Sequence, residues 1–148
     1  MDHPDTHRLI DFSEPVAVLY LSVGHHLTDD DEIGGVRDAV RGIVDTHAVA
    51  DSYLAFSQVV HDDPAAAARL SEQIGGAGIP WQTRTPAEVD ALVDGLEPVA
   101  PGMVDLHDWR PDRFQPALDP APEPLRPYEG IIGNRTGAYE YGGILRKA

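Results

Sequence analysis

The chain has 148 residues, enough for one domain, and carries a formal charge of −14 from 25 acidic and 11 basic residues. Because phosphate groups are bound through Lys and Arg, this balance makes nucleic acid and anionic membrane surfaces poor partners. The absence of cysteine excludes disulfides and thiolate metal sites, and no apolar stretch approaches the ~18 residues of a membrane span. We therefore expect a cytoplasmic protein in which residues 1–148 form a single domain.

The first predicted strand is the apolar run 16–23, which is typical of a strand buried on both faces inside a parallel sheet. The run breaks at Gly24, and His25 and His26 follow it, ahead of a leucine and a cluster of carboxylates. Open α/β sheets bind their ligands at the carboxyl ends of the strands. Residues 24–31 are therefore predicted to form a loop at a ligand site.

Helices and a second strand alternate after this loop. The apolar residues of 33–47 recur at helical spacing, and the run 52–60 is typical of a strand. An aspartate before Pro64 is a typical helix cap, so a helix is predicted from Pro64 to the glycine pair at 75–76. Thr85-Pro-Ala-Glu88 has the capping-box pattern that begins a further helix.

The last third of the chain is rich in proline. Short strands are predicted at 96–99 and 103–106, and a final strand at 139–146. Residues 111–127 contain six prolines and no periodicity, so we expect a Pro-rich surface loop there. The alternation predicts an α/β fold of mostly parallel strands joined by crossovers. The final strand follows a non-helical connection and is predicted to be antiparallel.

The histidine pair is the strongest candidate for chemistry. Because an imidazole titrates near neutral pH, His25 or His26 is a candidate general base. The alternative is that one of these histidines only packs at the strand end. On an extended backbone the two side chains point to opposite faces and cannot easily share a metal ion. His25 with Asp29 or Asp31 is a possible metal pair, but a helix N-terminus also explains the aspartates, and we predict no metal site.

The carboxyl end of the second strand offers a further set of polar residues. Gln58 and His61 lie there and are candidates for contacts with a substrate. Asp62 and Asp63 are explained by helix capping ahead of Pro64. The sequence has no Gly-x-Ser-x-Gly motif, so a hydrolase is not expected.

Several motifs together resemble the second half of class I S-adenosylmethionine-dependent methyltransferases, and most closely the actinobacterial S-adenosyl methyltransferase family, once catalogued as a domain of unknown function. The segments that carry the resemblance occur in the order of the family: 16–23, Gly24-His-His-Leu27, 53–60, Thr85-Pro-Ala-Glu88, 96–104, Trp109-Arg-Pro-Asp112 and Tyr141-Gly-Gly-Ile-Leu-Arg-Lys147. The resemblance implies a partial Rossmann-like sheet with strands 4, 5, 7 and 6, flanking helices and an antiparallel last strand.

The resemblance also implies S-adenosylmethionine as cofactor and a small-molecule methyl acceptor. It assigns cofactor contacts to Ser22, Val23, Gly24 and His25. The family usually has an apolar residue in place of Gly24, so we expect this glycine to loosen the backbone.

The glycine-rich turn of the family has no counterpart before the first strand of this chain. We therefore expect an incomplete enzyme that self-associates, or binds a partner chain, along the exposed edge of strand 16–23. The alternative is a non-catalytic remnant or interaction module of the same fold.

Overall fold

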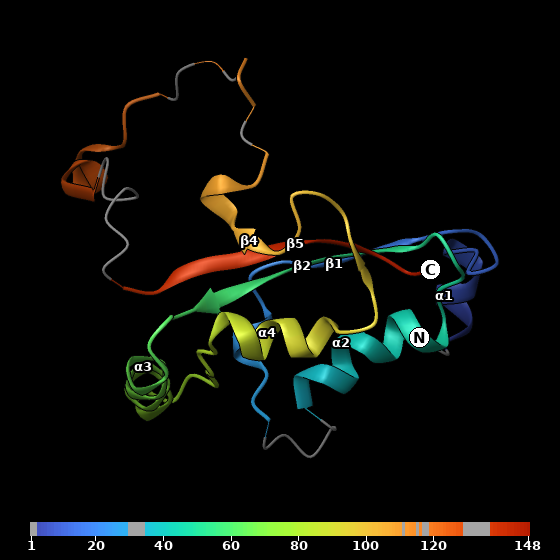
Figure 1. The fold of residues 1–148 in the computed structure, drawn as a ribbon, viewed down its shortest axis with the longest axis horizontal. Helices are drawn as coiled ribbons and strands as arrows, with labels where there is room; N and C mark the ends of the chain where they lie inside the picture. The colour runs from blue at the N-terminus through green and yellow to red at the C-terminus, as the bar shows by residue number, and fades with distance from the viewer. Residues whose placement is uncertain (1–2, 30–34, 111, 115, 117–118, 129–136) are drawn as a thin grey trace.

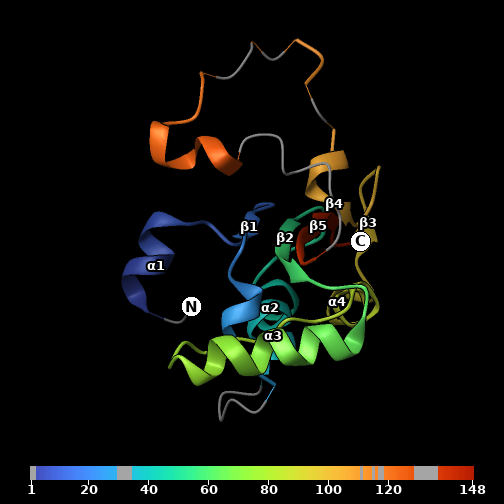
Figure 2. The same cartoon turned by 90° about the vertical axis from the view of Figure 1, so that its left-hand side faces the viewer.

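The computed structural model describes residues 3–29, 35–110, 112–114, 116, 119–128 and 137–148. The helices formed by residues 35–46, 64–76 and 86–93 lie on one side of the sheet, and the 3₁₀ turn of residues 106–108 lies on the other side (Figures 1 and 2). The helices are α1 (Pro4–Leu9), α2 (Gly35–Thr46), α3 (Pro64–Gly76) and α4 (Pro86–Val93). The strands are β1 (Ala17–Tyr20), β2 (Tyr53–Val60), β3 (Glu97–Pro98), β4 (Val104–Asp105) and β5 (Tyr139–Arg146). The described residues also form the 3₁₀ turns η1 (Gly24–His26), η2 (Leu106–Asp108) and η3 (Glu123–Tyr128).

The sheet has the order β1-β2-β5-β3, and β4 also pairs with β5. Only the β1–β2 pairing is parallel, and β5 is antiparallel to β2, β3 and β4. Four strands therefore run in one direction, with β5 reversed between β2 and the two short strands. The predicted α/β fold and the antiparallel last strand are confirmed. The strands other than β5 share one direction, as predicted, but only the β1–β2 pairing is parallel because β5 separates β2 from β3 and β4.

Strand β1 differs most from expectation. It is an edge strand of four residues, with Leu19 66% exposed, so the prediction of an interior strand buried on both faces is wrong. Val18 and Tyr20 turn toward the helices and pack against the core, whereas the odd-numbered residues turn away from it. A uniformly apolar run thus encodes a strand with one covered and one uncovered face.

The core lies between β2 and the helices α2 and α4. Residues Leu54, Phe56 and Val60 of β2 are fully buried, as expected for alternate residues on the covered face of a sheet. The helical spacing predicted for 33–47 is confirmed over α2 by burial of one stripe, whereas positions 33 and 34 lie outside the described residues. Helix α4 adds its own apolar stripe. The helical core residues are Val36, Val40, Val44, Val89, Leu92 and Val93.

The predicted helix starts are confirmed in atomic detail. The Asp63 side chain accepts a hydrogen bond of 2.8 Å from the amide of Ala65, directly before α3. Thr85 and Glu88 form the reciprocal capping box of α4. The described residues of 111–127 are mostly exposed, as predicted for a surface loop, but η3 was not foreseen.

Candidate functional site

The chain leaves β1 through a tight turn that carries the two histidines. Ser22 has a positive φ of 54°, and its amide donates to the carbonyl and to the hydroxyl oxygen of Ser57, both at 3.0 Å. The 3₁₀ turn η1 follows and places the rings of His25 and His26 4.5 Å apart, with Trp81 4.1 Å and 5.1 Å from them. The predicted extended backbone is therefore wrong here, because the turn brings both imidazoles to one indole.

Gly24 is required for close packing. A Cβ at this position would lie 2.7 Å from Oε1 of Gln58 and 2.8 Å from Cζ of Phe56. The expectation that Gly24 loosens the backbone is corrected: the residue is buried, and its missing side chain lets the histidine turn approach β2.

A buried guanidinium holds this turn in place. Arg84 is 2% exposed and lies directly before α4. Its Nη1 donates to the carbonyl of Gly24 at 3.2 Å and to Oε1 of Gln58 at 3.3 Å. Its Nη2 donates to the carbonyl of Leu27 at 2.9 Å and to Oδ1 of Asp29 at 2.8 Å. One side chain thus joins both ends of the turn to the end of β2.

Asp29 and Gln82 complete the network. The side-chain oxygen Oε1 of Gln82 accepts a hydrogen bond of 2.8 Å from the backbone amide of Asp29. The backbone amide of Gln82 donates to the carbonyl of His25 at 2.7 Å. Partial burial raises the pKa of Asp29, but hydrogen bonds from Arg84 and Gln82 outweigh burial and leave this pKa below its ordinary value. Asp29 therefore pairs with Arg84, and its role is not limited to the dipole of the following helix.

His25 is a structural residue in this geometry. Its side chain is 3% exposed, and Nδ1 accepts a hydrogen bond of 3.2 Å from the amide of Val59, so the ring proton of the neutral form lies on Nε2. Burial, the neighbouring His26 and Arg84 lower the pKa of His25 to about 4. At neutral pH the lone pair of His25 is already used, which leaves no lone pair for a general base.

His26 has the opposite character. Its side chain is exposed, and Nδ1 lies 3.1 Å from the carbonyl oxygen of Pro80. A carbonyl only accepts, so Nδ1 carries the proton in the neutral ring and Nε2 keeps its lone pair. The turn therefore presents one imidazole in the tautomer that a general base requires.

The two residues predicted to contact a substrate are placed differently from each other. Gln58 is fully buried and accepts from Arg84, so it cannot touch an acceptor in this structure. His61 is half-buried, and its Nδ1 accepts from the amide of Asp63 at 3.0 Å near the start of α3. The structure thus joins Gln58 to the histidine turn through Arg84, whereas His61 serves the cap of the next helix.

The predicted cofactor contacts do not form a complete site. Gly24 and His25 are buried, and the Gly24 carbonyl and the His25 Nδ1 already have partners. Ser22 and Val23 are exposed, but the Ser22 amide is bonded to Ser57. The polar groups of Gly24 and His25 are thus already bonded within the chain, and these residues by themselves do not fit a complete cofactor pocket.

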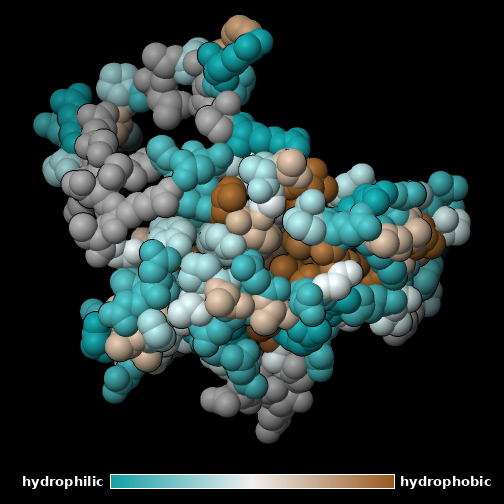
Figure 3. All heavy atoms as spheres, in the orientation of Figure 1, coloured by the Kyte–Doolittle hydropathy of each residue, from teal (hydrophilic) through white to brown (hydrophobic). Residues whose placement is uncertain are grey.

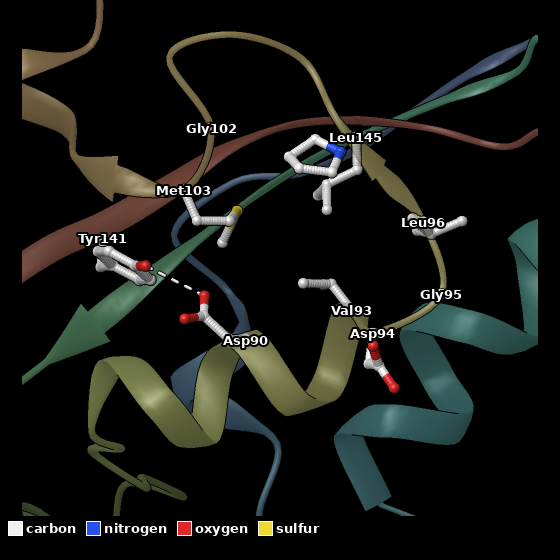
Figure 4. Close-up of a pocket in the computed structure, with 10 residues that line it drawn as sticks. Asp90, Val93, Asp94, Gly95, Leu96, Gly102, Met103, Tyr141 and Leu145 are labelled. Carbon is white, nitrogen blue, oxygen red and sulfur yellow. Dashed lines mark hydrogen bonds between the residues drawn. The ribbon is translucent and has the colours of Figure 1, made fainter.

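A cavity of about 330 Å³ lies near the opposite edge of the sheet, between α4, β5 and the loop from β3 to β4 (Figure 4). Figure 3 shows hydrophobic residues near the centre of this side of the molecule, where Figure 1 places β3 and β5 above α4. Tyr141 donates to Oδ1 of Asp90 at 3.0 Å, and burial together with Asp90 raises the pKa of Tyr141 to about 12. Tyr141 is therefore a protonated hydrogen-bond donor that closes one side of the cavity.

Among the residues that the structure describes, no three His, Asp or Glu side chains lie close enough together to hold a metal ion. Asp31, a member of the possible metal pairs, lies outside the described residues. No described helix is both long and apolar enough to cross a membrane.

The low pKa of His25 predicts a pH dependence of stability. The unfolded chain binds a proton to His25 near the ordinary pKa of about 6.5, but the folded chain binds it only near 4. Protonation therefore favours unfolding, and the free energy of unfolding should fall as the pH is lowered from about 6.5 toward 4. Urea denaturation of the wild type and of His25→Gln measures this difference. Equal pH slopes between pH 5 and 6.5 would contradict it.

Comparison with known proteins places this geometry in a family. The model of the S-adenosyl methyltransferase family matches residues 1–135, and no curated protein matches the chain. A crystal structure of a DUF574 family protein from Streptomyces avermitilis has 25% identity and a TM-score of 0.71, over 99% of this chain and 50% of that one. A protein from Thermobifida fusca, provisionally described as a methyltransferase, has 29% identity and a TM-score of 0.61, over 99% and 48%. The chain thus spans about half the length of these structures, and it belongs to the S-adenosyl methyltransferase family.

Proposed function

We propose that this chain forms one half of an S-adenosylmethionine-dependent methyltransferase that acts on a small molecule, and that His26 is its general base. The observation that carries the proposal is the His26 ring: Nδ1 is held by the Pro80 carbonyl, and Nε2 keeps a lone pair on an exposed side chain. His26 would take up the proton that the acceptor loses. The bound cofactor would supply the electrophilic methyl group.

The chain is proposed to be incomplete without further polypeptide. Support comes from the predicted cofactor contacts, of which Gly24 and His25 are buried with their polar atoms already bonded, and from the solved relatives, which are about twice as long as the matched region. Arg84 and Trp81 would then serve to orient His26 rather than to touch the cofactor. The cysteine-free, acidic composition supports a cytoplasmic location for this activity.

Calorimetric titration with S-adenosylmethionine tests the incompleteness. We expect no heat of binding from the chain alone, and binding when the half of the Streptomyces avermitilis protein that this chain does not match is added in equal amount. That half titrated without this chain is the control, and it should bind more weakly than the mixture. Tight binding by the chain alone would refute the proposed incompleteness.

A non-catalytic interaction module is the second candidate function. It is supported by the histidine turn, where most polar atoms already have partners inside the chain, as in a purely structural element. The two candidate functions predict different results in the titration with S-adenosylmethionine. A mixture that assembles but does not bind S-adenosylmethionine would favour the interaction module.

A further inference from the structure

We infer that the cavity between α4, β5 and the loop from β3 to β4 is a binding site for a small organic cation, an amine whose ammonium group is carried by a compact apolar body. The ammonium would bind Asp90, and the body would lie on the apolar floor of the cavity. None of the described residues that line this cavity belongs to the histidine turn, and β2 and β5 lie between β1 and β3 in the sheet. The site is therefore distinct from the one that carries the proposed function, and the inference does not rest on that function.

The floor of the cavity is apolar and is formed by three parts of the chain. Val93 of α4 and Leu145 of β5 are 3% and 2% exposed, and Met103 ends the loop from β3 to β4. Figure 4 shows these three side chains pointing toward the same space. The volume of about 330 Å³ lies at the lower end of the range of small-molecule sites, which is about 300–1,000 Å³. The cavity therefore suits one compact apolar group rather than a nucleotide or a long chain.

The polar side of the cavity determines which kind of group a ligand must bring. Tyr141 donates its only hydroxyl proton to Oδ1 of Asp90 at 3.0 Å, as Figure 4 shows. A carboxylate has no proton of its own, so Oδ2 of Asp90 and the lone pair left on the phenol oxygen can only accept hydrogen bonds. A ligand must therefore supply donors at this side, and an ammonium group supplies up to three of them together with a positive charge.

The charges around the cavity favour a cation over an anion. Asp94 also lines the cavity, although its side chain points away from the floor in Figure 4. Arg41 donates to the carbonyl of Asp94 at 2.6 Å, but its guanidinium is paired with the carboxylate of Asp45 at 2.9 Å. Asp90 is thus the charged residue that faces the floor among the described residues lining the cavity. The formal charge of −14 on the whole chain adds to its attraction for cations.

Methionine labelling gives a direct readout of the cavity, because the chain contains two methionines, Met1 and Met103, and Met103 lines the cavity. The full chain, isotope-labelled in its methionine methyl groups, is titrated with cyclohexylmethylammonium and followed by NMR. We expect the Met103 methyl signal, assigned with Met103→Leu, to shift and to saturate. Cyclohexylmethanol and cyclohexanecarboxylate have the same ring without the positive charge, and they should bind at least tenfold more weakly.

Asp90→Asn tests the carboxylate itself. The asparagine oxygen can still accept from Tyr141, but the negative charge is lost, so the affinity for cyclohexylmethylammonium should fall at least tenfold. Glu72→Gln, which removes one charge from an exposed position of α3, is the matched control and should bind like the wild type. Thermal unfolding of each variant verifies that it is folded.

Three results would overturn the inference. They are a Met103 signal that does not change with the ammonium probe, equal affinity for the ammonium and the alcohol, and equal affinity of the wild type and Asp90→Asn for the ammonium. Because the titration contains neither S-adenosylmethionine nor a methyl acceptor, its failure would leave the proposed function untouched.

Discussion

Replacing Arg84 with methionine is expected to lower the free energy of unfolding by about 3 kcal/mol or more, measured by urea denaturation. The methionine fills a similar volume, but it leaves the carbonyls of Gly24 and Leu27 and the oxygens of Gln58 and Asp29 without their donor. Hydrogen bonds to a charged group contribute about 1.5–3 kcal/mol each, although contributions within one network do not add fully. Arg84→Lys should recover only part of the loss, because one ammonium cannot reach all four acceptors.

Arg8→Met is the matched control for this experiment. Arg8 lies on the exposed helix α1 and pairs with Asp5 at 3.1 Å. Exposed pairs of this kind contribute little, so the variant should stay within about 0.5 kcal/mol of the wild type. A loss of less than about 1 kcal/mol in Arg84→Met would contradict the role assigned to Arg84.

The elements that depend on local rules could be predicted from the sequence. The cap of α3 by Asp63, the capping box of Thr85 and Glu88, and the buried stripe of α2 each follow from residues close together in the chain. The reversed direction of β5 was also foreseen, because its preceding connection contains no periodic helix. These features were predictable because none of them depends on contacts between distant parts of the chain.

The surroundings of β1 could not be predicted in this way. An apolar run is compatible with a strand covered on both faces or on one, and only the assembled sheet decides between them. Leu19 is exposed because β1 ends the described sheet, although its residue type suggested burial.

The environment of each candidate site residue could not be predicted from the sequence. The histidine pair was identified, yet the sequence could not separate buried His25 from exposed His26. Arg84 was missed, because it lies in a polar connector that has no helical or strand periodicity. A contact between positions 24 and 84 forms only in the fold, where Gly24 lets the turn approach β2.

His26→Asn is expected to reduce the rate of methyl transfer by about 100-fold or more in the mixture of this chain with the unmatched Streptomyces half. The asparagine amide can still donate to the Pro80 carbonyl, but it lacks the basic nitrogen that takes up a proton. His61→Asn is the control and should keep the wild-type rate, because His61 serves the start of α3.

The central claim is tested most directly by the initial rate of methyl transfer. Labelled S-adenosylmethionine is incubated with a mixture of small molecules, and the rate is measured for the wild type and for these two variants. The proposed function predicts transfer that needs both polypeptides, falls with His26→Asn and is unchanged with His61→Asn. Wild-type and His26→Asn mixtures of equal rate, or a wild-type mixture without transfer, would contradict it.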